Sequence, residues 1–171
     1  MKSQRIAAAF ALGCMALVVV AMPSSAATDH GSQNHTAQYH PDHGDGGHAL
    51  ELDNGNKWAT DSPLRAGMAR LRGLMAEAIP AIHRGGISHA EYDLLADAVS
   101  AEITFLVNNC QLEPAADVQL HKIIATILSG VGIMQGRVKD QQRQRGAGKI
   151  VAAVNDYGRY FDDPGFVLLN H

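Results

Sequence analysis

Histidine is the residue type that most clearly indicates chemistry in this chain, because five of its nine histidines fall within one short segment. Asp29 directly precedes the first of them, and Asp42 and Asp45 lie between the others. Neutral imidazole is a common ligand for transition metals, and it suits zinc, copper and nickel. The segment therefore predicts a metal-binding site whose ligands are His30, His35, His40, His43 and His48.

The spacing of these histidines indicates an adaptable site. Four, four, two and four residues separate them in turn, a pattern that matches no fixed zinc motif. The surrounding residues 27–57 are rich in Gly, Asn, Asp and His and lack an apolar period, so we expect a flexible tail that folds around an ion. The alternative is a solvated linker with incidental histidines. We favour metal binding, with copper or zinc as the metal.

Cys110 and His121 are two further candidate metal ligands, but helix geometry argues against a direct pair. Cys110 precedes a predicted helix that begins at Pro114 and carries His121. The rise between Pro114 and His121 is about 10 Å at about 1.5 Å per residue. Cys110 is alternatively a buried small apolar residue or the partner in an intermolecular disulfide. His121 is alternatively a histidine at the edge of a bundle, hydrogen-bonded to a neighbour.

Several constellations typical of enzymes and electron carriers are missing from the sequence. It contains no C-x-x-C-H for covalent haem, no G-x-S-x-G and no H-E-x-x-H. We therefore predict that the protein is not an enzyme. A haem-binding bundle is a further hypothesis, in which Met68 on the first helix is the candidate ligand, although residues 150–163 supply no histidine as its partner.

The N-terminal residues have the pattern of a secretory signal. Lys2 and Arg5 precede an apolar run, and small residues then lead to an expected cleavage site after Ala26. A lipoprotein signal ending at Cys14 is the weaker alternative. Cleavage predicts export to the periplasm with no membrane span in the mature chain. The formal net charge of −3 becomes more negative without Lys2 and Arg5, which disfavours nucleic acid as a partner.

Four amphipathic helices are expected in residues 58–171. The first opens near Asp61-Ser62-Pro63, the second at the capping box Ser88–Glu91 and the third at Glu113-Pro114. A polar stretch over residues 137–149 is expected to end in a loop at 146–148, and the fourth helix to follow from residue 150. Because the connections are short, the pattern predicts an all-α, antiparallel up-down four-helix bundle behind the histidine-rich tail.

Three stretches resemble a family of small exported helical proteins of Gram-negative bacteria. They are ELDNGNKWATDSPLRAGMARLRGLM, NNCQLEPAADVQLHKIIATIL and IVAAVNDYGRYFDDPGF, and the resemblance spans roughly residues 50–166. Members of this largely uncharacterised family often carry a histidine-rich start after the signal. The resemblance implies a link to heavy-metal resistance and supplies no catalytic residues.

The leading hypothesis is a periplasmic protein that binds or buffers copper or zinc through its tail, with Cys110 and His121 as secondary contributors. The second is a non-enzymatic module whose bundle docks a partner protein of the cell envelope. The sequence leaves the oligomeric state open.

Overall fold

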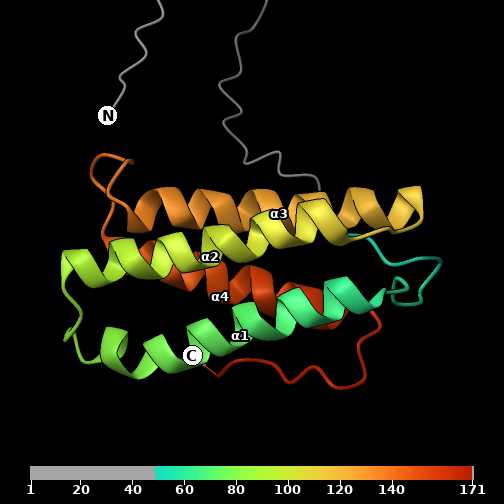
Figure 1. Ribbon diagram of the computed structural model, residues 1–171, viewed down its shortest axis with the longest axis horizontal. Helices are drawn as coiled ribbons and strands as arrows, with labels where there is room; N and C mark the ends of the chain where they lie inside the picture. The colour runs from blue at the N-terminus through green and yellow to red at the C-terminus, as the bar shows by residue number, and fades with distance from the viewer. Residues whose placement is uncertain (1–48, 171) are drawn as a thin grey trace, which may run out of the picture. The chain divides into compact units, whose positions relative to one another are not determined.

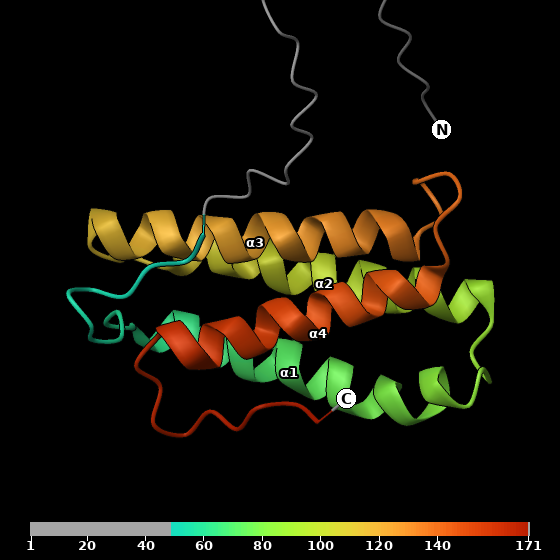
Figure 2. The same ribbon diagram turned by 180° about the vertical axis from the view of Figure 1, so that it is seen from behind.

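The bundle is described by a computed structural model over residues 49–170, and all of the regular secondary structure there is helical. Its helices are α1 (Ser62–His83), α2 (His89–Asn109), α3 (Pro114–Met134) and α4 (Arg143–Tyr160). Each helix runs back along the one before it (Figures 1 and 2). The predicted all-α four-helix bundle is therefore confirmed. The expected signal, residues 1–26, lies outside the described residues.

Local capping explains why the first three helices begin where the sequence predicts. The Asp61 side chain accepts a hydrogen bond from the Leu64 N–H at 2.7 Å, which caps α1. Ser88 and Glu91 form both hydrogen bonds of the capping box before α2. Pro114 opens α3, in the first turn where its missing N–H costs nothing.

The start of α4 differs from the prediction, because residues 146–148 are helical and the helix begins at Arg143. Gly146 faces α3 so closely that an added Cβ would lie 2.5 Å from the Gly130 carbonyl oxygen. Gly130 makes the reciprocal approach, since its Cβ would lie 2.7 Å from the Gly146 oxygen. Gly130 and Gly146 are therefore packing residues. The close contact of α3 and α4 overrides the tendency of Gly146 to form a loop.

The core contains inward residues of all four helices, and the C-terminal segment closes one side of it. Leu64, Leu106, Ile127 and Ile150 are fully buried. Asn155, which is also buried, donates to the Leu169 carbonyl at 3.0 Å and accepts from the Leu169 N–H at 2.7 Å. Of the apolar residues 166–169, Phe166 and Leu169 pack against the bundle, while Val167 and Leu168 are exposed.

None of the helices in residues 49–170 combines the length and the apolar character needed to cross a membrane.

Candidate functional site

The five histidines predicted as metal ligands, His30, His35, His40, His43 and His48, lie outside the described residues. The described chain starts at Ala49, directly after the last of them. Its first residues therefore show where the histidine-rich segment joins the bundle.

The junction is held against α3 by specific hydrogen bonds. The Ala49 carbonyl accepts from the Lys122 ammonium at 3.0 Å, and the Glu51 N–H donates to the side-chain oxygen of Gln119 at 3.1 Å. The Trp58 indole N–H in turn donates to the Glu51 carbonyl at 2.6 Å. Gln119 is only 6% exposed, and its side-chain oxygen accepts from both the Glu51 N–H and the Lys122 ammonium. Residues 49–57, assigned to the tail by the sequence, thus contact the bundle in the structure.

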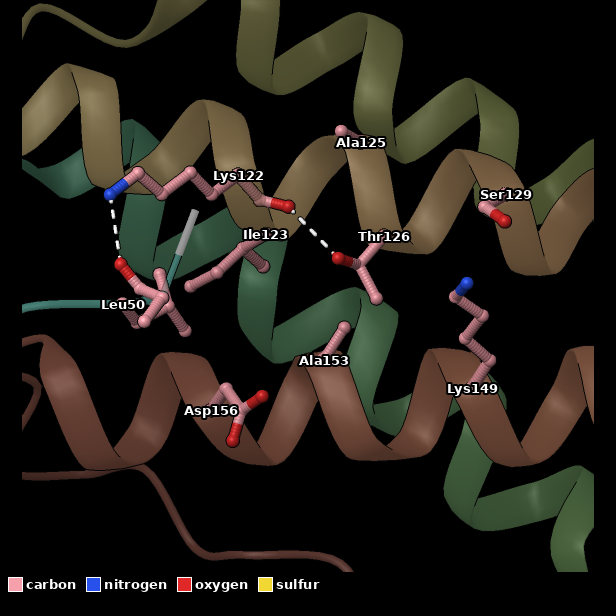
Figure 3. A pocket seen from close by; sticks show the side chains of 10 residues that line it. Leu50, Lys122, Ile123, Ala125, Thr126, Ser129, Lys149, Ala153 and Asp156 are labelled. Atoms are coloured by element: carbon pink, nitrogen blue, oxygen red, sulfur yellow. Dashed lines mark hydrogen bonds between the residues drawn. The ribbon is translucent and has the colours of Figure 1, made fainter. Parts of the chain in front are cut away.

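A groove lies beside this junction, between α3 and α4 (Figure 3). Its volume is about 470 Å³. Leu50 and Ile123 form part of its apolar lining, and small residues keep it open: Ala125, Ser129 and Ala153. Lys122 and Asp156 lie toward one end in Figure 3, and Ser129 and Lys149 toward the other.

The groove is not predicted by the sequence, although one signal for it is present. Ala125 and Ser129 are one helical turn apart, as are Lys149 and Ala153, so each helix presents small or flexible side chains on a single face. The predicted loop at 146–148 leaves Lys149 outside the fourth helix. In the structure α4 begins at Arg143, so Lys149 shares a helix face with Ala153.

Cys110 is half-buried at the C-terminal end of α2, where its thiol is held in the neutral form. Burial, together with the negative charges of Asp61 and Asp117, raises the pKa of Cys110 to about 11. Asp61 is fixed there because its second carboxylate oxygen accepts from the Gln111 N–H at 2.6 Å. The local environment therefore disfavours the thiolate that a metal would need.

His121 is exposed on α3 and interacts with its own helix. Its Nδ1 lies 2.9 Å from the Asp117 carbonyl oxygen and 3.3 Å from a carboxylate oxygen of the same residue. Asp117 is thus a neighbour of both candidate ligands. No group of three or more His, Cys, Asp or Glu side chains is gathered for a metal ion within residues 49–170.

Met68, the candidate haem ligand, lies in the bundle interior with two other methionines. Met68, Met75 and Met134 are all fully buried. Each packs in the hydrophobic cluster together with apolar neighbours, the usual place of methionine in a helical core.

Comparisons with protein-family models, with curated proteins and with solved structures found no match to this chain.

Proposed function

We propose that this protein binds transition-metal ions, copper or zinc, in the periplasm through the histidine-rich segment that precedes the bundle. The observation that carries the proposal is the concentration of His30, His35, His40, His43 and His48 in nineteen consecutive positions, 30–48. Each neutral imidazole offers one ring nitrogen to an ion, and a chain rich in glycine wraps several rings around it.

The bundle serves as the scaffold that carries this segment. The hydrogen bonds of Ala49 and Glu51 to α3 support that role, because they anchor the chain one residue after His48. Cys110 and His121 are secondary candidates. Because the pKa of Cys110 is raised, a metal bound there has to displace a tightly held proton. Cys110 is therefore a weaker candidate ligand than the tail histidines.

Isothermal titration with Cu²⁺ and Zn²⁺ tests the proposal. The chain 27–171 is expected to take up metal, and the same chain lacking residues 28–48 is expected to lose most of the uptake. A Cys110→Ser, His121→Ala variant is the matched control and is expected to retain it. Equal and negligible uptake by the full and the shortened chains would exclude the tail as the site.

Uptake by the tail is also expected to depend on pH. A histidine binds metal only in its neutral form, and the ordinary imidazole pKa is about 6.5. Titration at pH 5 is therefore expected to show much weaker binding than titration at pH 7.5.

Docking of an envelope protein is the second candidate function, and exposed apolar side chains favour it. Leu94 and Val107 on α2 are 69% and 60% exposed, and Val118 on α3 is 55% exposed. Scattered exposed residues are common on soluble proteins, so the metal proposal stands first. Affinity capture from envelope extracts that retains no protein, with or without metal, would contradict the docking function.

A further inference from the structure

The α3–α4 groove has a defined direction and length. Its lining runs from Lys122 to Ser129 on α3 and from Asp156 back to Lys149 on α4. Seven residues of helix separate the two ends on each helix, which corresponds to about 10 Å at about 1.5 Å per residue. Lys122 and Lys149 therefore lie toward opposite ends of the groove.

The described chain begins at one end of this groove. The Lys122 ammonium donates to the Ala49 carbonyl and to the Gln119 side-chain oxygen, and the Glu51 N–H donates to the same Gln119 oxygen. These bonds hold Ala49 at the end of the groove opposite Lys149. Both Ala49 and Leu50 line the groove themselves.

The residues that come next have the length and the chemistry to fill the rest of it. They are Asp45-Gly46-Gly47-His48. In an extended conformation four residues span about 13 Å at about 3.3 Å per residue, enough to bring Asp45 to the level of Lys149. Gly46 and Gly47 have no side chains that would clash with Ala125 and Ala153, which line the groove between its two ends.

The charges of the two partners are complementary. Residues 27–48 contain three aspartates and no lysine or arginine. Lys149 is exposed and makes no hydrogen bond or ion pair with the described part of the chain. Asp156 lies at the opposite end of the groove and forms an ion pair with Arg159.

We propose that residues 45–48 of this chain dock in the α3–α4 groove, with the Asp45 carboxylate paired to the Lys149 ammonium. This goes beyond the metal-binding function, because the bundle then holds the last tail histidine against its surface. A metal ion that recruits His48 together with the earlier histidines has to draw the segment out of the groove, so docking and metal uptake oppose each other.

Amide NMR spectra of the ¹⁵N-labelled chain 27–171 without metal test the proposal. Lys149→Glu is expected to shift the resonances of Gly46 and Gly47 as well as those of Ala125 and Ala153. Lys139→Glu makes the same charge change at an exposed residue between α3 and α4. It is expected to leave the resonances of Gly46 and Gly47 unchanged. The paired variant Asp45→Lys, Lys149→Glu is expected to restore the resonances of Ala125 and Ala153 toward their original positions.

Two results would overturn the docking. One is that Gly46 and Gly47 respond to neither charge change, or equally to both. The other is that the resonances of Ala125 and Ala153 move with protein concentration while those of Gly46 and Gly47 do not, which would place a second copy of the chain in the groove. Metal uptake is titrated separately on the same samples, so a failure of the metal function is distinguished from a failure of docking.

Discussion

Cys110 shows how position decides what a reactive residue type does. It terminates α2, and its backbone N–H donates to the Leu106 carbonyl at 2.9 Å. Its thiol shares the end of the bundle with the carboxylates of Asp61 and Asp117, which raise its pKa further. Asp61 is present there for a structural reason, since it caps α1 and also accepts from the Gln111 N–H. A neutral, half-buried thiol is the result.

The raised pKa predicts a loss of stability at alkaline pH. Between the ordinary thiol pKa of 9.0 and the folded-state value of about 11, the unfolded chain releases a proton that the folded chain keeps. The free energy of unfolding therefore falls as the pH rises through this window. Burial and Asp163 also raise the pKa of Tyr157. Its hydroxyl therefore adds to the fall in the free energy of unfolding above pH 10.

Urea unfolding from pH 7 to pH 10.5 measures this effect. Cys110→Ser is expected to lose less stability than the wild type between pH 9 and pH 10.5, because serine does not titrate there. Tyr157→Phe serves as the comparison for the tyrosine contribution. Parallel pH profiles for Cys110→Ser and the wild type would contradict the assigned pKa.

At the scale of elements, helix starts were predictable where a local signal determines them. Asp61, Ser88 and Pro114 act within their own first turns, so a short window of sequence contains the whole cause. The start of α4 was not predictable in this way. Gln142 precedes it without a side-chain cap, and Arg143 instead donates to the Met134 and His89 carbonyls on other elements. Tertiary contacts thus decide where α4 begins.

The glycines of α4 provide a matched pair that tests this explanation. A Cβ at Gly146 would lie 2.7 Å from the Met134 backbone nitrogen, in addition to its contact with Gly130, whereas a Cβ at Gly148 would meet nothing within 4 Å. Gly146→Ala is expected to destabilise the bundle by about 2 kcal/mol through overpacking. Gly148→Ala is expected to stabilise it by about 0.5–1 kcal/mol through helix propensity.

Chemical denaturation of the two variants measures these free energies. Gly132→Ala in α3 is a second open position, with no atom within 4 Å of an added Cβ, and serves as the control for helix propensity. Equal effects at Gly146 and Gly148 would show that the close approach of α3 and α4 does not determine the start of α4.

At the scale of the whole molecule, the groove and the junction depend on contacts between distant residues. Glu51 meets Gln119, Lys57 donates to the Gly158 carbonyl at 2.8 Å, and the Trp58 backbone bonds to both Tyr160 and Asp162. Residues 49–57 are polar and lack an apolar period, so no local pattern distinguishes them from the preceding tail. Their contacts are mainly made by backbone groups, which sequence patterns do not reveal.

Two truncations separate the tail from the junction. A chain that begins at Ala49 keeps every contact of the described bundle, so its melting temperature is expected to lie within about 2 °C of that of the chain 27–171, because a surface ion pair contributes little. A chain that begins at Trp58 loses the bonds of Ala49, Glu51 and Lys57 and the packing of Leu50. At about 1 kcal/mol per hydrogen bond, we expect its melting temperature to fall by roughly 10–15 °C. Thermal unfolding followed by circular dichroism measures both differences. Equal melting temperatures for the two shortened chains would show that residues 49–57 do not stabilise the bundle.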